Sequence, residues 1–145
     1  YLYSSSNNTV TGNTCNNNNA YGIYVYSSSN NTITGNTCNN NASNGIRLTS
    51  SSNNNTITGN TCNNNTYGIY LTSSSNNTVT GNTCIRGTGL TTDYTSSQYT
   101  IRLNGTDNNY NLIAINNCMG KAVVVGGGTG NSVYGNKWDA GNDLP

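Results

Sequence analysis

The sequence predicts an all-β chain wound as a parallel β-helix, and two observations lead to this prediction. A segment of about 22 residues recurs along the chain, which is typical of a solenoid whose units bury their apolar faces against one another. Its copies are residues 21–38, 44–62 and 67–84, and its second half opens the chain at residues 4–15. Within each copy, short runs alternate apolar and polar residues and are bounded by Asn, Ser and Gly, as strands and turns are. We therefore expect three short strands in each coil.

The aligned copies form columns that continue through the more divergent last third of the chain. The central apolar position is Val10, Ile33, Ile57, Val79, Ile113 and Val133. The steps between these positions are 23, 24, 22, 34 and 20 residues, so the long step indicates an insertion, placed at residues 85–97. We expect one β-helix domain over residues 1–145, with about five and a half coils.

Asparagine occupies the expected corners of every coil. An Asn stands two residues before and three residues after the central position in each of the six copies. The second of these columns is Asn13, Asn36, Asn60, Asn82, Asn116 and Asn136. Because rungs of a β-helix stack about 4.8 Å apart, each side-chain amide can donate to the next Asn and satisfy turn groups that would otherwise be unpaired. The sequence therefore predicts asparagine ladders, and Gly12 and its counterparts are expected at positive φ.

The cysteines follow the same period. Cys15, Cys38, Cys62, Cys84 and Cys118 stand five residues after the central position, where the last copy has Trp138. We expect them to be small apolar residues of the interior. Disulfides between neighbouring rungs are an alternative, although parallel side chains suit the disulfide dihedral angle poorly. Metal binding is a second alternative, but the chain has neither a His nor a C-x-x-C motif.

The composition narrows the classes of function. Charged residues make up 6% of the 145 residues, the net charge is +1, and Asn fills 33 positions. This balance gives no electrostatic attraction to nucleic acid or to a membrane surface. No apolar run approaches the ~18 residues of a membrane span. No cofactor is expected. Disorder is disfavoured, because disordered chains usually combine low hydrophobicity with a high net charge.

The unit Gly-Ile-Tyr-Leu-x-x-Ser-x-Asn-Asn-Thr-(Ile/Val)-Thr-Gly-Asn, at residues 68–82, resembles the repeats of the NosD-like and carbohydrate-binding/sugar-hydrolase superfamily. The resemblance covers nearly the whole chain and implies a right-handed parallel β-helix of the kind frequent in archaeal surface proteins. Its functional implication is broad, because the superfamily includes polysaccharide lyases, epimerases, phage tailspikes, copper-processing proteins and non-enzymatic surface proteins. The copper role finds no support in a chain without His and with Met119 as its single Met. No catalytic motif of the family can be transferred residue by residue.

Outward positions of the first strand form a stripe of Tyr and Arg. The candidate ligand-binding residues are Tyr24, Tyr26, Arg47, Tyr70 and Arg102. Tyr rings stack on sugar faces and Arg donates hydrogen bonds to acidic glycans. The alternative is that Tyr is present for its strand propensity and for ring stacking between rungs.

A second outward pattern is a set of Thr-x-Thr rows, which resembles the ice-binding faces of some β-solenoid antifreeze proteins. The candidate ice-binding residues are Thr9, Thr11, Thr32, Thr34, Thr56, Thr58, Thr78 and Thr80. The alternative is the ordinary preference of Thr for exposed strands. The rows end at Leu112 and Ala114.

The insertion holds Arg86 and Asp93, with Arg102 nearby, and a loop that leaves a solenoid is a place where a catalytic site can be built. A lone Asp cannot supply both the acid and the base of a hydrolase, so ordinary surface charges are favoured there.

Glycosylation sequons are numerous and are expected on turns if the chain is exported. They are Asn7, Asn30, Asn41, Asn54, Asn64, Asn76 and Asn104.

The two ends of the chain differ. Gly126, Gly127 and Gly128 replace the serines of earlier copies, and Trp138 replaces Cys, so residues 121–145 are expected to cap the solenoid. Tyr1 begins in the middle of a strand. We therefore expect a C-terminal part of a longer solenoid, whose partner at that end is its own upstream coils or another copy.

These observations favour a non-enzymatic structural or adhesive protein of the cell surface or the extracellular space, whose Tyr/Arg face contacts a surface polysaccharide. A polysaccharide lyase or hydrolase with catalytic residues upstream or near Asp93 is the first alternative. An ice-binding protein is the second.

Overall fold

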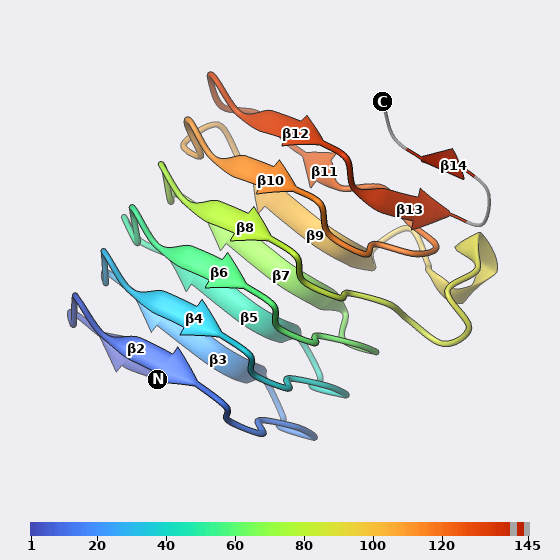
Figure 1. The fold of residues 1–145 in the computed structure, drawn as a ribbon, viewed down its shortest axis with the longest axis horizontal. Helices are drawn as coiled ribbons and strands as arrows, with labels where there is room; N and C mark the ends of the chain where they lie inside the picture. The colour runs from blue at the N-terminus through green and yellow to red at the C-terminus, as the bar shows by residue number, and fades with distance from the viewer. Residues whose placement is uncertain (140–141, 144–145) are drawn as a thin grey trace.

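The chain winds into a solenoid whose coils are joined by two parallel sheets, in a computed structural model that describes residues 1–139 and 142–143 (Figure 1). Sheet A consists of β1 (Leu2–Tyr3), β3 (Tyr21–Tyr26), β5 (Asn44–Thr49), β7 (Tyr67–Thr72), β9 (Tyr99–Asn104) and β11 (Val124–Val125). Sheet B consists of β2 (Thr9–Thr11), β4 (Thr32–Thr34), β6 (Thr56–Thr58), β8 (Thr78–Thr80), β10 (Leu112–Ala114) and β12 (Ser132–Tyr134).

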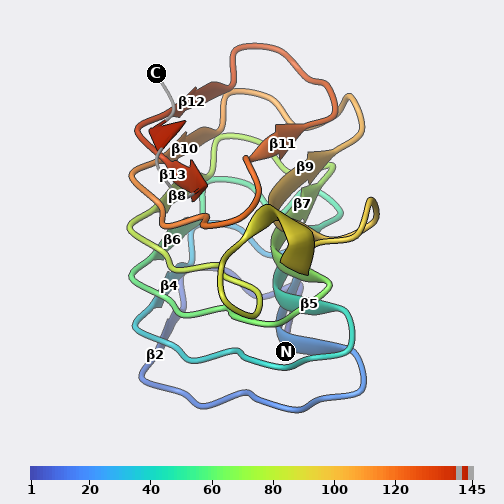
Figure 2. The ribbon, with the colours of Figure 1, turned by 90° about the vertical axis from the view of Figure 1, so that its right-hand side faces the viewer.

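Each coil gives one strand to each sheet, and equivalent residues of neighbouring coils lie opposite one another. Ile33 pairs with Val10 on one side and with Ile57 on the other. The third predicted strand is reduced to one bridging residue per coil, as in the pairing of Thr37 with Thr14 and Thr61. The coils rise from the N-terminus with a right-handed turn (Figures 1 and 2). The predicted parallel β-helix is therefore confirmed, with six strands in each sheet.

The interior is a continuous stack of the predicted apolar columns. Ile46, Leu48 and Ile57 have no exposed surface, and the same holds for their counterparts in the next coil. Cys62 belongs to this stack and is 1% exposed. Trp138, in the last coil, packs against the apolar core. The columns lie inside because rungs about 4.8 Å apart bring identical side chains into contact along the axis.

The predicted asparagine ladder is also confirmed. The side-chain Oδ1 of Asn60 accepts hydrogen bonds from the backbone N–H and from Nδ2 of Asn36, both at 3.0 Å. Nδ2 of Asn60 in turn donates to Oδ1 of Asn82 at 3.0 Å and to the backbone carbonyl of Ile33 at 2.9 Å. A parallel ladder runs from Asn8 along the other edge of sheet B. These bonds pair turn groups that water cannot reach.

A glycine at the second position of the long strands allows the chain to turn tightly over the cysteine column. A Cβ atom at Gly68 would lie 2.4 Å from the carbonyl oxygen of Thr100 and 2.8 Å from Cβ of Cys84. Gly22 and Gly45 are similarly crowded. A side chain at these glycine positions would face the interior, as that of the following Ile does. Two successive residues therefore face inward, and the strict alternation of the strand is broken near its start.

The C-terminal part departs from the regular coil. Residues 85–98 form the insertion, which contains the 3₁₀ turn η1 (Thr91–Asp93) and lies outside the stacked coils, on the side that faces the viewer in Figure 2. The chain ends in an antiparallel pair, β13 (Lys137–Asp139) and β14 (Asn142–Asp143). Residues 140–141 and 144–145 of the predicted cap lie outside the described residues. In the described part of the chain, no helix has the length and apolarity needed to span a membrane.

Candidate binding face

The outer face of sheet A presents aromatic and basic side chains in columns along the solenoid axis. The middle column contains Tyr24, Arg47, Tyr70 and Arg102, whose strand register places each opposite the next. A neighbouring column contains Tyr21, Asn44, Tyr67 and Tyr99. We define the tyrosine face as Tyr21, Tyr24, Arg47, Tyr67, Tyr70, Tyr99, Arg102 and Lys121.

The guanidinium group of Arg47 lies among three rings of this face. Its Cζ is 5.1 Å from the ring centre of Tyr21, 5.5 Å from that of Tyr24 and 5.4 Å from that of Tyr70. Nη1 of Arg47 also donates a 2.7 Å hydrogen bond to the hydroxyl of Tyr21. Burial raises the pKa of Tyr24 and Tyr70, and the Arg47 charge opposes this effect. Three cation–π contacts and one hydrogen bond hold the side chain in one place on the face.

A second group of this kind surrounds Tyr99. Its ring centre is 4.4 Å from Cζ of Arg102 and 4.1 Å from Nζ of Lys121. The Tyr99 ring is also stacked on that of Tyr67, with centres 5.6 Å apart and planes at 3°. Nζ of Lys121 donates to the backbone carbonyls of Thr95 and Gln98, which ties the insertion to this end of the face.

The N-terminal end of the face is hollowed. An open pocket of about 340 Å³ is lined by Tyr1, Tyr21, Tyr24 and three small or polar neighbours. The rings of Tyr1 and Tyr24 are stacked, with centres 5.0 Å apart. The face therefore combines flat aromatic surface with a shallow depression.

The remaining predicted residue of the face, Tyr26, lies in a third column beside it. Its ring stacks on that of Tyr3, with centres 5.2 Å apart and planes at 8°. Thr49, the next residue of that column, is 8% exposed, so this column does not continue as an open surface.

Four residues of the face were not predicted from the sequence: Tyr21, Tyr67, Tyr99 and Lys121. Strict alternation places Tyr21 on the same side as Ile23, inside the solenoid. The inward turn of Gly22 reverses this order and leaves Tyr21 outside, against Tyr24. The sequence does carry a signal for two of these positions: Tyr21 and Tyr67 each stand immediately before a recurring Gly-Ile pair.

Asp93 in the insertion is held by groups of its own loop. Oδ2 of Asp93 accepts hydrogen bonds from the backbone N–H and hydroxyl of Thr88, at 2.8 and 2.7 Å, and from the N–H of Leu90 at 3.1 Å. The hydroxyl of Thr88, together with these backbone groups, lowers the pKa of the Asp93 carboxyl. A carboxylate that is held by its own loop in this way maintains the shape of the loop.

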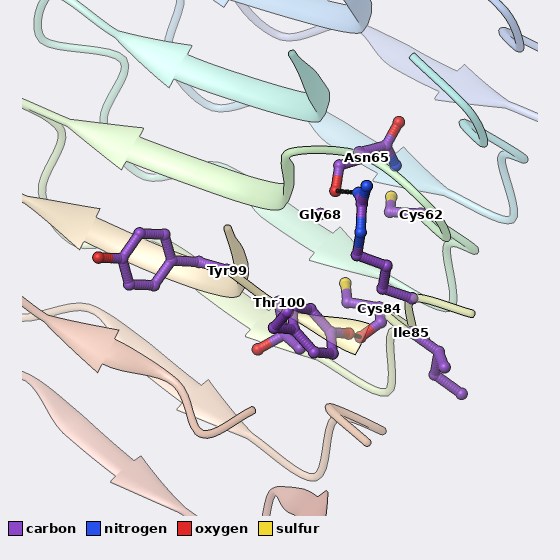
Figure 3. A pocket seen from close by; sticks show the side chains of 9 residues that line it. Cys62, Asn65, Gly68, Cys84, Ile85, Tyr99 and Thr100 are labelled. Atoms are coloured by element: carbon purple, nitrogen blue, oxygen red, sulfur yellow. Dashed lines mark hydrogen bonds between the residues drawn. The ribbon is translucent and has the colours of Figure 1, made fainter. Parts of the chain in front are cut away.

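The insertion also covers the corner next to Cys84 (Figure 3). Nη1 of Arg86 donates to the backbone carbonyl of Asn65 at 3.0 Å. The hydroxyl of Tyr94 donates to the backbone carbonyl of Met119 at 3.1 Å. The small hollow that remains between these groups has no volume for a water molecule. Burial raises the pKa of Tyr94, as expected for a phenol that is packed against the coil.

On sheet B the threonine rows lie in strict register. Thr32 pairs with Thr9 and Thr56, and Thr34 pairs with Thr11 and Thr58. The rows continue to β8 and end at β10, where Ala114 is 1% exposed. The outer face of sheet B therefore presents a regular grid of hydroxyl and methyl groups over four coils.

The sequons fall into two environments. Most lie at exposed turns with the asparagine at positive φ, as at Asn30 and Asn54. Asn104 is partly exposed at the end of β9. Asn41 does not fit a glycosylation site, because it is 2% exposed and its Oδ1 accepts two hydrogen bonds from Asn18.

All five cysteines are free thiols, so neighbouring rungs are not joined by disulfides. Cys38, Cys62, Cys84 and Cys118 are buried, and Cys15 is partly buried. Burial raises the pKa of the Cys118 thiol to about 12. The column therefore consists of protonated, apolar side chains at neutral pH.

Fold and surface together define a repeat protein of the parallel β-solenoid class, with an aromatic and basic outer face on one sheet. The chain belongs to the NosD family: the family described as periplasmic copper-binding protein (NosD) matches residues 1–143. No curated protein and no solved structure matches the chain significantly.

The copper implied by the family description does not fit the residues of this chain. There is no His, and Met119 is the single Met. The soft ligands that remain are thiols, which bind metals as thiolates, whereas burial keeps the Cys118 thiol protonated at neutral pH. Among the described residues, no group of three His, Cys, Asp or Glu side chains could hold a metal ion.

Proposed function

We propose that the chain is a structural and adhesive β-solenoid that acts outside the cytoplasm and contacts glycans through the tyrosine face. The family description supports an extracytoplasmic location, since it is that of a periplasmic protein. The regular interior supports a rigid rod, because the six strands of each sheet stack in register.

The observation that supports glycan contact most is the arrangement of rings around Arg47. Tyr21, Tyr24 and Tyr70 surround its guanidinium group at 5.1 to 5.5 Å from their centres. Aromatic rings offer apolar faces to the C–H groups of a sugar, and an oriented guanidinium donates hydrogen bonds to its oxygens. A flat sheet with such groups in columns suits an extended polysaccharide better than a small enclosed ligand, for which pockets are deep.

A glycan array with paired variants tests this proposal. We expect the wild-type chain to bind one class of extended glycan and Tyr70→Ala to lose about tenfold in affinity, which corresponds to about 1.4 kcal/mol. Thr56→Ala, which changes β6 on the outer face of sheet B, should bind as the wild type does. Equal binding by both variants, or no binding to any glycan, would overturn the proposal.

A direct assay separates this function from polysaccharide cleavage. We expect no release of unsaturated or reducing sugars from the glycan that binds, and no difference between the wild-type chain and Asp93→Ala. Turnover that Asp93→Ala abolishes would replace the proposed function with an enzymatic one.

Ice binding is a second candidate, and the register of the threonine grid favours it. Thr32, Thr56 and Thr78 lie directly opposite one another along the axis. The spacing is about 4.8 Å between coils and about 6.6 Å within a row, so the hydroxyl groups form a regular lattice. Thermal hysteresis should be measurable in the wild-type chain and lost in Thr56→Lys if this candidate holds. Absence of hysteresis would dismiss it.

A further inference from the structure

The tyrosine face contains three basic side chains and no acidic one among its described residues. It holds Arg47, Arg102 and Lys121, which are three of the five basic residues of the chain. The acids nearest in sequence are Asp93, which is held by Thr88 and Leu90 in the insertion, and Asp107, in the turn after β9. Burial is the main cause of the raised pKa of Tyr24 and Tyr70. The charged groups that also act on these two pKa values are arginines and other tyrosines, and no carboxylate is among them.

The excess of positive charge is greatest around Tyr99, where two cations lie against one ring. Arg102 and Lys121 are 4.4 and 4.1 Å from its centre. Burial lowers the pKa of Lys121, and the charge of Arg102 lowers it further. The buried Nε of Arg102 has no hydrogen-bond partner among the described residues. Two like charges that repel each other at the same ring are stabilised by an anion placed between or above them.

The available donors suit an oxyanion. An ammonium has three N–H donors, and Lys121 uses two of them on the carbonyls of Thr95 and Gln98. The planar guanidinium of Arg102 can bind a carboxylate or sulfate group through two parallel hydrogen bonds. The position is open to a ligand, since Lys121 and Arg102 are both partly exposed.

A second charge lies in line with the first. Arg47 and Arg102 occupy the same column two rungs apart, with Tyr70 between them. Two rungs correspond to about 10 Å along the axis. An extended chain along this column can therefore place one acidic group at Arg102 and Lys121, a sugar ring over Tyr70, and another acidic group at Arg47.

We infer that the ligand of the tyrosine face is an acidic polysaccharide, with carboxylate or sulfate groups, and that Arg102 and Lys121 form its principal anion-binding site. This inference rests on the proposed glycan-binding function. It adds the charge of the ligand and the position at which that charge is bound.

Two soluble polymers with the same β-glucan backbone test the inference: carboxymethyl cellulose, which is acidic, and hydroxyethyl cellulose, which is neutral. We expect the first to bind at least about tenfold more tightly, and its affinity to fall by a further factor of about ten between roughly 20 mM and 500 mM NaCl. Binding is measured by affinity electrophoresis and by calorimetry on the full chain.

Charge-removing variants locate the site. Arg102→Gln and Lys121→Gln should each lower the affinity for carboxymethyl cellulose by about tenfold, and Arg102→Lys should recover part of that loss. Lys137→Gln, which removes the same charge from β13, should leave the affinity unchanged. Circular dichroism and urea unfolding of every variant separate a lost contact from a lost fold.

The outcomes distinguish this inference from the function on which it depends. Equal, salt-independent binding of both polymers would overturn the inference and leave glycan binding intact. A loss of affinity in Lys137→Gln that matches the loss in Arg102→Gln would overturn the assignment of the site, because general charge would then account for binding. Binding of neither polymer would overturn the inference, whereas the proposed function fails only if no glycan of the array binds.

Discussion

Sheets A and B surround the same interior but present unlike outer faces. Both contribute fully buried aliphatic residues, such as Leu71 in β7 and Val79 in β8, to one stack. Outside, sheet A has rings and guanidinium groups, whereas sheet B has rows of threonine. The comparison indicates that stacking fixes the inward residues of every strand, while outward residues are free to differ. A binding function is therefore expected in what distinguishes the faces, and stability in what they share.

The largest expected effect is alkaline destabilisation of the shared interior. Burial raises the pKa of Cys118 to about 12 from its ordinary value of 9.0, and Cys38, Cys62 and Cys84 are buried in the same column. The unfolded chain releases these protons near pH 9 while the folded chain retains them. Stability is therefore complete below that pH and decreases above it. Cys118, which stays protonated in the folded chain, therefore costs about 1.4 kcal/mol at about pH 10, and the raised pKa values of Cys38, Cys62 and Cys84 act in the same direction and add to this loss.

Urea unfolding under reducing conditions at several pH values measures this effect. Cys118→Val should reduce the alkaline slope by about 1.4 kcal/mol per pH unit. A free energy of unfolding that is constant between about pH 8 and pH 10 would contradict a protonated interior column.

The next largest effect is expected for Asn60→Ala, in the ladder at the edge of sheet B. The substitution leaves the buried N–H of Asn36 without a partner and removes the side-chain hydrogen bonds to Asn82 and to the carbonyl of Ile33. The unpaired N–H costs roughly 1–3 kcal/mol and each lost hydrogen bond about 1 kcal/mol, so we expect a loss of about 3–5 kcal/mol in the free energy of unfolding. Asn54→Gly is the matched control: it changes an exposed turn asparagine with φ of 57° and should alter stability little. Equal losses in the two variants would show that the ladder contributes no more than an ordinary turn.

A smaller effect is expected for Arg47→Leu, which changes sheet A alone. The loss of three partly buried cation–π contacts and of the hydrogen bond to Tyr21 should lower the free energy of unfolding by about 1–2 kcal/mol. Arg47→Lys should recover part of it. If Arg47→Leu were as damaging as Asn60→Ala, the outer face of sheet A would have a structural role equal to that of the interior, and the comparison between the faces would fail.

Most of the fold could be predicted from the sequence because the same residue types recur at equivalent positions of successive coils. The columns of Ile33, Asn36 and Cys38 identify interior and corner positions by recurrence alone. The third short strand expected in each coil is a single bridge, because Thr37 is bounded by the corner Asn36 and the inward Cys38.

The tyrosine face was predicted only in part, for a steric reason. Alternation places Tyr21 inside, and only the close contact of Gly22 with the cysteine column shows that the chain turns there. Lys121 lies beyond the insertion, in a coil whose sequence has diverged, and its place beside Tyr99 depends on the three-dimensional path of residues 85–98. The charges of the face are therefore apparent only when distant segments are brought together.

Mapping of backbone amide shifts by NMR during a titration with carboxymethyl cellulose oligosaccharides tests the central claim most directly. If the tyrosine face is the binding surface, the shifts will concentrate in β5, β7 and β9, with the largest changes near Tyr70, Tyr99 and Arg102. Shifts that fall instead on β4, β6 and β8, or that are spread evenly over both sheets, would contradict the account.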